Sequence, residues 1–330
     1  MPRSPFANGI IQIADIALGM LAISLSISLL ANAITHWLTD IFTHFQLQYA
    51  IGSLILYLFF TLFKEWKRCL LCLGLCLFSS SYIALSYSFK APSESEAVFS
   101  VASYNRNYAP THHDEVLAFL KQEKPDIVVL QEANASLSQA VESVRDLYPH
   151  QIHEPREHAF GMVVLSKHPF TKKRVKHFDR IVWDNFQINI EVEILGQAIN
   201  IFAIHPPPPM NAGLYKQRNI ELSLTATDAY HSQSRNVIML GDWNVSPFSP
   251  HFRAVLKKTG LRNEQTLPYI FPTWPAQFVV PIIQIPIDHI LHRGNLELVE
   301  KKRFPAIGSD HYPVVARYAF SSQNNITSNF

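Results

Sequence analysis

The chain has few cysteines and no excess of charge of either sign. Its 330 residues include three cysteines, 28 Lys and Arg, and 26 Asp and Glu. Cys69, Cys72 and Cys76 share one apolar run without a fourth metal ligand nearby, so we interpret them as packing residues of a helix. The rest of the chain lacks cysteine and must fold on its hydrophobic core alone. The balanced charge excludes a strong basic field that would attract nucleic acid regardless of sequence.

Charged residues are also scarce near the N-terminus, where three long apolar runs follow one another. The runs are Ile16–Ile34, Ile41–Phe63 and Cys69–Phe89, and none contains Asp, Glu, Lys or Arg. Each has roughly the 20 residues that cross about 30 Å of hydrocarbon. Helices on a soluble surface would show a polar face, which these runs lack. We therefore predict that residues 1–90 form a membrane anchor of three transmembrane helices, at about residues 10–34, 41–63 and 69–89.

Basic residues beside these runs predict their orientation. Lys64, Lys67 and Arg68 lie between the second and third runs, whereas the turn 35–40 has neither Lys nor Arg. The positive-inside rule places the basic segment, and with it the N-terminus, in the cytoplasm. Everything after about residue 90 would then lie outside the cytoplasm. In a Gram-negative cell this describes a multi-pass inner-membrane protein with a periplasmic domain.

The remainder of the chain has the patterns of a mixed globular domain. We expect a linker at 91–96, a domain at 97–320 and a loose polar tail at 321–330. Apolar periodicity predicts strands near 98–105, 126–131, 161–166, 186–194, 198–205, 236–241, 286–292 and 312–320, and helices near 113–121, 136–147, 213–231 and 249–259. Several strands follow one another without helices between them. This order favours an α+β fold of packed mixed and antiparallel sheets with helices outside.

Polar side chains follow the predicted strands where these end. Asp242 and Asn244 come directly after the apolar run Val237–Gly241. Together they provide a proton acceptor and an amide donor, which could orient a water molecule and hold a phosphate oxygen. The alternative is an Asx turn that caps the strand.

Three other strand ends carry groups of the same kind. Glu132 follows a buried strand and offers hard oxygen ligands, which suit magnesium or manganese better than zinc. His205 precedes four prolines and could donate a proton to a phosphoryl oxygen or a leaving group. An imidazole needs a partner to fix its tautomer, and we predict that Asp288 is this partner for His311. A solvated strand end for Glu132 and surface turns for the others are the alternatives.

In this order the motifs resemble the endonuclease/exonuclease/phosphatase superfamily, which has the deoxyribonuclease-I-like fold. The resemblance covers about residues 97–320. The motifs are Ser-Tyr-Asn105, Gln131-Glu132, the segment from Gly161 to Pro169, Ile-His205, Gly-Asp242-Trp-Asn244, Ile-Asp288-His289 and Gly-Ser309-Asp310-His311. The segment from Pro272-Thr-Trp-Pro275 to Asp288 is similar to a subgroup of bacterial membrane-anchored members. The family implies a four-layer αββα sandwich with its site at one edge.

The resemblance also implies roles for individual residues. Glu132 would bind Mg²⁺ or Mn²⁺ directly, with Asn105 and Asp310 close by as ligands or beside the ligands. The implied catalytic residues are His205, Asp242, Asn244, Asp288 and His311. Among them, Asp242 would orient or activate water, Asn244 and His205 would stabilise developing charge, and His311, paired with Asp288, would move a proton or hold the phosphate. Trp243 stands where Phe is more usual, and the loop after His205 is unusually rich in proline.

These features predict a membrane-anchored, metal-dependent phosphoesterase that acts outside the cytoplasm. Its expected partners are a lipid bilayer and a phosphoester substrate, which could be lipid-linked, nucleic acid or a small phosphate ester; we expect no obligate protein partner. An exported nuclease and a catalytically inactive binding protein are the alternatives. A channel or transporter is disfavoured because the apolar runs lack paired charges, Asp15 being the one candidate.

Overall fold

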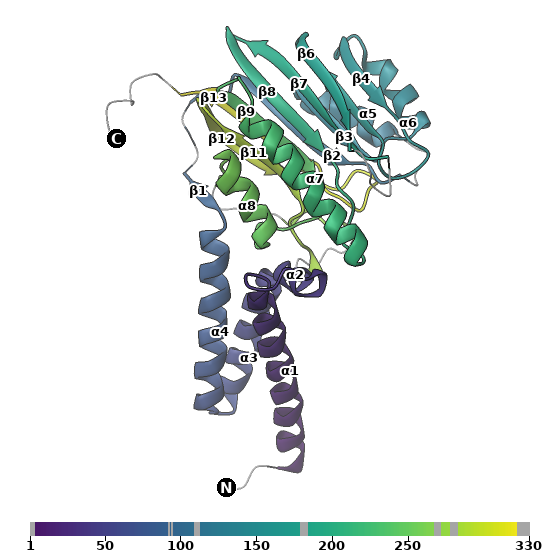
Figure 1. Cartoon of the computed structure of the whole chain (residues 1–330). Coiled ribbons are helices and arrows are strands. Elements are labelled where there is room, and N and C mark those ends of the chain that lie inside the picture. The colour runs from purple at the N-terminus through teal and green to yellow at the C-terminus, as the bar shows by residue number, and fades with distance from the viewer. Residues whose placement is uncertain are drawn as a thin grey trace, which may run out of the picture.

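The computed structural model describes residues 4–91, 93, 95–108, 113–178, 184–266, 272–277 and 283–321. It consists of a sandwich of two β-sheets that stands on a stalk of N-terminal helices (Figure 1). Most of the predicted tail, residues 322–330, and linker residues 92 and 94 lie outside the described residues.

The two sheets contain most of the strands that the sequence predicts. The six-stranded sheet has the order β12-β13-β2-β3-β5-β4, and the five-stranded sheet has the order β11-β9-β8-β7-β6. The strands are β2 (Phe99–Asn105), β3 (Ile127–Gln131), β4 (His150–Glu154), β5 (Met162–Ser166), β6 (Phe170–His177), β7 (Phe186–Ile194), β8 (Gln197–Ile204), β9 (Asn236–Asp242), β11 (Asp288–Arg293), β12 (Leu296–Arg303) and β13 (Val314–Phe320). Only neighbours β2–β3 and β8–β9 within these two sheets are parallel.

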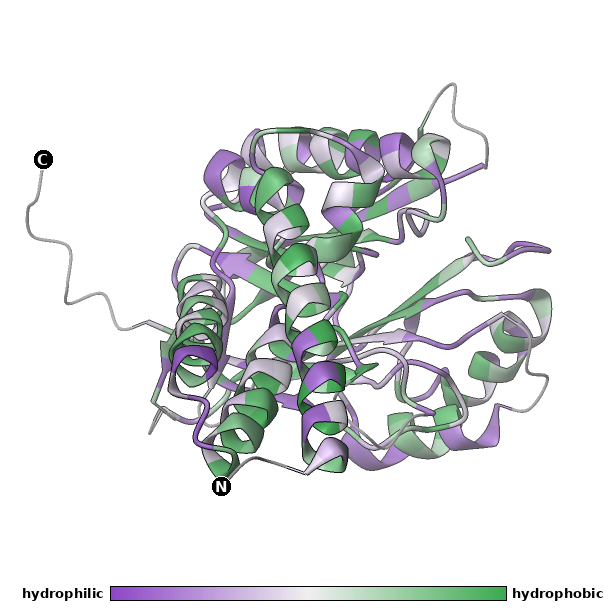
Figure 2. Ribbon diagram, turned by 90° about the horizontal axis from the view of Figure 1, so that it is seen from below, coloured by the Kyte–Doolittle hydropathy of each residue, from purple (hydrophilic) through white to green (hydrophobic). Residues whose placement is uncertain are grey.

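Side chains alternate along each central strand, so each strand contributes to two hydrophobic layers, one between the sheets and one beneath the helices. Val101 of β2 and Ile238 of β9 point into the core between the two sheets. Their neighbours Ala102 and Val237 point the opposite way, toward helices. Since successive side chains of a strand face opposite sides, a strand buried on both faces reads as a continuous apolar run. The view from below shows how much of these strands is hydrophobic (Figure 2).

Helices cover the outer face of each sheet. On the six-stranded sheet these are α5 (Asp114–Glu123), α6 (Ala135–Ala140) and the 3₁₀ turn η1 (Val141–Val144), and on the five-stranded sheet α7 (Ala212–Tyr230) and α8 (Pro250–Thr259). The predicted α+β sandwich is therefore confirmed. The helix predicted over 136–147 is shorter, because it tightens into the 3₁₀ turn at Val141.

The stalk departs from the prediction of three straight spans. It contains α1 (Pro5–Leu30), α2 (Trp37–Thr43), α3 (Gln46–Leu62) and α4 (Trp66–Leu85). Among the described residues, α1 and α4 are each long and apolar enough to cross a membrane. Helices α2 and α3 are bent by 59° relative to each other, and they would add a third span only if the pair together crosses the membrane. The single helix predicted over 41–63 is thus divided near Thr43.

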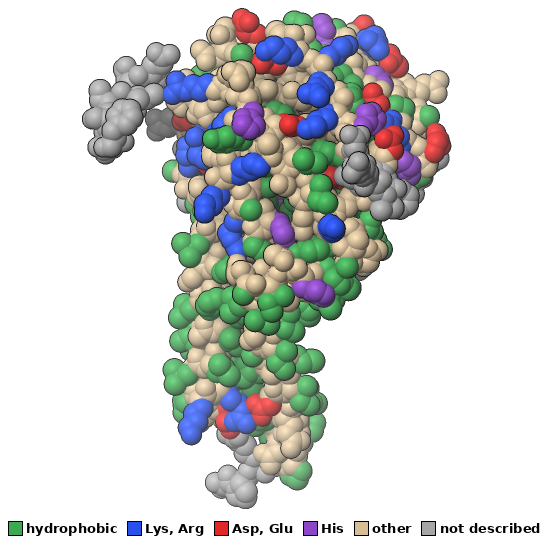
Figure 3. All heavy atoms as spheres, in the orientation of Figure 1, with side chains coloured by type: hydrophobic (Ala, Val, Ile, Leu, Met, Phe, Trp, Pro, Cys, Tyr) green, Lys and Arg blue, Asp and Glu red, His purple; other side chains and the backbone are tan. Residues whose placement is uncertain are grey.

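The surface of the stalk is mostly apolar between its two ends. Ile16, Met20, Ile23 and Leu58 are among its exposed side chains. Figure 3 shows this apolar band and, at the lower end of the stalk, a cluster of charged side chains. Among the charged residues of the stalk, Arg68 contacts both Asp15 and Glu65. An exposed apolar band bounded by charge is typical of a surface that meets lipid.

The stalk is joined to the sandwich by more than a flexible linker. Residues Ser88–Lys90 form strand β1, which pairs in parallel with β10 (Glu264–Thr266). Asn263 Nδ2 donates a hydrogen bond to Ser86 O at 3.0 Å, and Lys90 Nζ lies 3.4 Å from Glu264 Oε2. These contacts fasten the end of α4 to the domain before residue 91.

Candidate active site

Six chain segments bring polar side chains to one edge of the sandwich. The strands β2, β3, β8 and β9 end there, β11 begins there, and the loop before β13 passes beside them. In the register of β9 and β11, Asp242 and Asp288 are directly opposite. The cavity at this edge is lined by Glu132, His205, Asp242, Asn244, Asp310 and His311, six of the eight predicted site residues. Asn105 and Asp288 are buried beside them.

Unusual backbone conformations place several of these groups. Glu132 and Asn244 have positive φ angles of 57° and 49°, a conformation that costs energy for a side chain such as that of Glu and that Asn adopts more readily. Gly241 has φ 137°, and a Cβ there would lie 1.9 Å from Ile204 O. The close approach of β8 and β9 at Gly241 brings His205 and Asp242 together.

Asp242 is the centre of the polar cluster. Its Oδ2 accepts a hydrogen bond from Asn105 Nδ2 at 3.0 Å and lies 3.4 Å from His205 Nε2 and 3.7 Å from His311 Nε2. Its Oδ1 accepts from the backbone N–H of Asn244 at 2.9 Å. Burial opposes ionisation of Asp242, but the charges of His311 and His205 and these hydrogen bonds outweigh it and lower its pKa to about 2.

The predicted partnership of Asp288 and His311 is present in the structure. Nδ1 of His311 lies 2.9 Å from Asp288 Oδ2, which leaves Nε2 directed at Asp242. Burial disfavours the imidazolium, yet the charges of Asp288 and Asp242 raise the pKa of His311 to about 10. Oδ1 of Asp288 has no hydrogen-bond partner among the described residues. The two ring nitrogens of His311 thus face two carboxylates, whose charges favour the imidazolium form.

Glu132 and Asp310 face the same cavity from two different loops. Glu132 accepts hydrogen bonds from Tyr108 N at 2.7 Å and from Asn105 Nδ2 at 2.9 Å. Asp310 accepts from Asn107 Nδ2 at 2.9 Å and from Trp274 Nε1 at 3.0 Å. Ser309 Oγ also donates to Asp310, at 3.4 Å. Each carboxylate is thus held by at least two donors and keeps further lone pairs for a ligand.

The oxygen atoms of these carboxylates fit a hard divalent cation such as Mg²⁺ or Mn²⁺. Asn105 is less suited to direct ligation, because its Oδ1 already accepts from Asn107 N at 3.0 Å and its amide nitrogen bridges Glu132 and Asp242. Its contacts favour orienting the carboxylates. Ligand atoms of Asp242, Asp288 and His311 also lie within 4.8 Å of one another. A protonated His311, however, has no lone pair for a metal.

Some residues of the site could not be recognised as site residues from the sequence. Trp274 belongs to the Pro272-Thr-Trp-Pro275 motif, which in the sequence indicates only a subgroup, yet it fixes Asp310 by a hydrogen bond. Ile41, His44 and Phe45, where α2 meets α3, line the cavity although they belong to the predicted second span. In the sequence, the polar residues between the first two apolar runs are the signal that could have indicated this departure from a membrane span.

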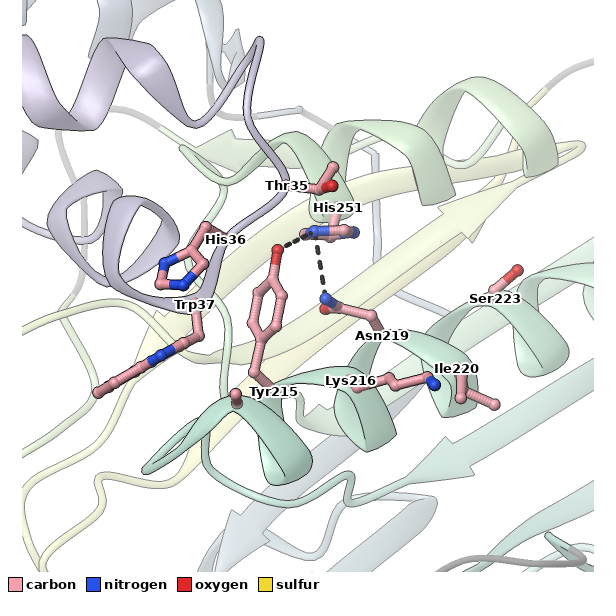
Figure 4. A pocket seen from close by; sticks show the side chains of 10 residues that line it. Thr35, His36, Trp37, Tyr215, Lys216, Asn219, Ile220, Ser223 and His251 are labelled. Atoms are coloured by element: carbon pink, nitrogen blue, oxygen red, sulfur yellow. Dashed lines mark hydrogen bonds between the residues drawn. The ribbon is translucent and has the colours of Figure 1, made fainter.

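A second cavity lies on another side of α2. Its volume is about 530 Å³, and Thr35, His36 and Trp37 line it together with residues of α7 and α8. Figure 4 shows its polar contacts: His251 Nε2 lies 2.7 Å from the Tyr215 hydroxyl and 3.2 Å from Asn219 Nδ2. Its described lining contains no carboxylate, so it lacks the groups that hydrolysis with a metal requires.

The sequence comparison identifies the family. The model of the endonuclease/exonuclease/phosphatase family matches residues 99–311. The chain therefore belongs to this family. No curated protein gives a significant match over the chain.

Solved structures confirm the fold. A family member from Beutenbergia cavernae is 20% identical with a TM-score of 0.56, covering 68% of this chain and 72% of its own. A humanized TDP2 from D. rerio is 16% identical with a TM-score of 0.53, covering 67% and 98%. Sphingomyelinase C from Streptomyces griseocarneus is 18% identical with a TM-score of 0.51, covering 68% and 99%. At these identities the similarity establishes the fold alone.

Proposed function

We propose that the protein is a membrane-anchored, divalent-metal-dependent phosphoesterase that acts outside the cytoplasm. The main support is the presence of Glu132, Asp242 and Asp310 in one cavity with two histidines. Three carboxylates alone would repel a phosphate, so a phosphate-binding role requires a cation between them. Membership of the endonuclease/exonuclease/phosphatase family supports the same chemistry.

Glu132 and Asp310 are the residues we propose to hold Mg²⁺ or Mn²⁺, with Asn105 orienting Glu132 through its hydrogen bond. The ion would neutralise charge on the phosphate oxygens. The donors around the two carboxylates fix their positions in advance, which reduces the reorganisation needed when substrate binds.

The remaining residues are proposed to carry the reaction. The oxygen of a water molecule forms a bond to phosphorus and gives up one proton, the bond from phosphorus to the ester oxygen breaks, and this leaving oxygen takes up one proton, so that protons balance over the reaction. Asp242, ionised because of its low pKa, accepts a hydrogen bond from the attacking water. Asn244 and His205 stabilise charge on the phosphoryl oxygens. His311, oriented by Asp288, holds the phosphate or supplies the proton.

The proposed location rests on the basic residues at the lower end of the stalk. Lys64, Lys67 and Arg68 would lie in the cytoplasm, and the sandwich, at the opposite end, in the periplasm. An alkaline phosphatase reporter fused after residue 95 is expected to be active, and one fused after Lys67 inactive. The reverse pattern would place the domain in the cytoplasm.

The catalytic proposal is tested with the full-length protein in detergent and bis(p-nitrophenyl) phosphate. We expect hydrolysis that needs Mg²⁺, stops with EDTA and returns when metal is added back. The Asp242→Ala variant should hydrolyse the ester roughly 100- to 10,000-fold more slowly. The control Asp146→Ala, which replaces an exposed acid distant in sequence from Asp242, should keep the wild-type rate. Absence of hydrolysis of this ester, DNA, RNA, phospholipids and phosphosugars would favour an inactive binding protein instead.

A further inference from the structure

The membrane stalk supplies one wall of the candidate active site. Ile41 and Phe45, where α2 bends into α3, line the same cavity as Asp242 and Asp310. The bend is fastened to the domain, since Gln48 Nε2 donates to Gln284 O at 2.7 Å and His44 Nδ1 lies 2.8 Å from Ser246 Oγ. The cavity, of about 550 Å³, is therefore built jointly by the stalk and the sandwich.

The lining of this cavity combines the polar site residues with a larger number of apolar residues. Its apolar lining residues include Ile41, Phe45, Phe160, Met210, Ile285 and Ile287. Among the described lining residues there is no Lys or Arg. Proteins bind the nucleic-acid backbone mainly through Lys and Arg, which this lining lacks. Apolar walls with a few convergent polar groups suit a ligand with a hydrocarbon part and one polar group.

The cavity also lies at the level where a bilayer would end. Helix α4 has 20 residues and is therefore about 30 Å long, which matches the hydrocarbon thickness of a bilayer. Its lower end carries Lys67 and Arg68, and α2 lies where the stalk meets the sandwich (Figures 1 and 3). A chain that leaves the apolar wall of the cavity at α2 would enter the hydrocarbon layer directly.

We propose that the substrate is an amphiphilic phosphoester drawn from the bilayer, with its phosphate at the floor formed by Glu132, Asp242 and Asp310. Its hydrocarbon chain lies along the wall formed by Ile41, Phe45 and Met210. This inference rests on the proposed phosphoesterase function and adds the class of substrate. The α2–α3 bend determines specificity in this arrangement, because it places apolar side chains of the anchor beside the reacting group.

The test uses the full-length protein and two diesters that differ only in chain length, p-nitrophenyl ethyl phosphate and p-nitrophenyl hexadecyl phosphate. Since each buried methylene strengthens binding, we expect kcat/KM for the hexadecyl ester to be higher by about tenfold or more. Equal values for the two esters, or faster cleavage of a DNA oligonucleotide than of the hexadecyl ester, would overturn this inference while leaving the phosphoesterase function intact. Hydrolysis of neither ester and of none of the substrates that test the phosphoesterase function would overturn both.

Single substitutions test which residues cause the preference for the longer chain. Ile41→Gln and Met210→Gln should each reduce the ratio of hexadecyl to ethyl kcat/KM by about fivefold or more. Met210 is 74% exposed, so its replacement should not prevent folding. The control is Leu38→Gln, on the same helix, 46% exposed and outside the cavity lining, which should keep the ratio. An unchanged ratio in Met210→Gln and Ile41→Gln would contradict the proposed wall.

Delivery from the bilayer is distinguished from delivery through water by surface dilution. The protein is reconstituted in phosphatidylcholine vesicles, and the lipid is increased at a constant amount of hexadecyl ester. We expect the rate to fall as the mole fraction of ester in the membrane falls. A rate that follows only the bulk concentration of ester would contradict uptake from the bilayer.

Discussion

Asp40 of the stalk forms a buried ion pair with Arg218 of the sandwich. Arg218 Nη2 lies 2.6 Å from Asp40 Oδ2, and the two side chains are 0% and 1% exposed. Arg218 also donates to Asn244 O at 3.0 Å, and Ser249 Oγ donates to Asp40 Oδ1 at 2.5 Å. A charged side chain of the stalk is thereby one contact away from Asn244 of the candidate site.

Replacing one partner of this pair should destabilise the whole protein. Asp40→Ala leaves a buried guanidinium without its counter-ion, which typically costs about 3–5 kcal/mol. Removing both charges with the double variant Asp40→Leu, Arg218→Met should recover much of this loss. Thermal unfolding in detergent measures both. The control is Glu142→Ala, whose solvent-exposed pair with Arg145 should contribute little to the unfolding temperature.

A fragment of residues 97–330 should be poorly stable and poorly active. The fragment lacks α2, and with it Asp40 and the cavity wall at Ile41 and Phe45. The buried Arg218 is therefore left without its counter-ion. We expect lower solubility and a lower unfolding temperature than for the full chain, measured under identical detergent conditions. A fragment as stable and active as the full chain would show that the stalk contacts contribute little.

The pairing of Asp288 with His311 should matter for rate more than for binding. Asp288→Asn keeps the size of the side chain but removes the negative charge that orients the imidazole. Partners that orient a histidine bound to a metal typically contribute 10- to 100-fold. By analogy we expect kcat to fall by about that factor with little change in KM. The pKa of His311, followed by NMR, should fall from about 10 toward its ordinary value. An unchanged pKa would argue against the pair.

The buried Lys301 should make the free energy of unfolding depend on pH in an unusual way. Burial lowers the pKa of Lys301 to about 7, and its Nζ donates to Ile290 O at 3.2 Å. The unfolded chain then binds this proton more tightly than the folded chain between pH 7 and about 10.5. Stability relative to Lys301→Met should therefore rise with pH over this window, by about 1.4 kcal/mol per unit at most. Chemical denaturation at several pH values measures this difference, and a flat difference would contradict it.

The sequence predicts best the parts of the fold whose two faces are buried. Strand β9 contains the apolar run Val237–Leu240 and ends in Gly241-Asp242, so both the strand and its site residue could be recognised. Strands β6 and β12 were not predicted, because they lie at sheet edges and are rich in Lys and Arg. Charged edge strands prevent aggregation, but they also hide the alternating pattern.

The contribution of the stalk to the site could not be predicted for a different reason. Asp40 and His44 are polar residues at the start of an apolar run, and their partners Arg218 and Ser246 lie 178 and 202 residues further along the chain. Local periodicity contains no information about such distant pairs. It therefore indicates a straight span over 41–63, whereas the tertiary contacts favour a bend.

The most direct test of the metal–phosphate site is to measure binding of Mn²⁺ by electron paramagnetic resonance, together with phosphodiester hydrolysis, in the full-length protein. We predict one tightly bound ion that is lost in Glu132→Gln along with the activity, and that is retained in the control Glu142→Gln, which is exposed and remote from the cavity. Unchanged Mn²⁺ binding in Glu132→Gln, or wild-type hydrolysis in metal-free buffer, would contradict the account.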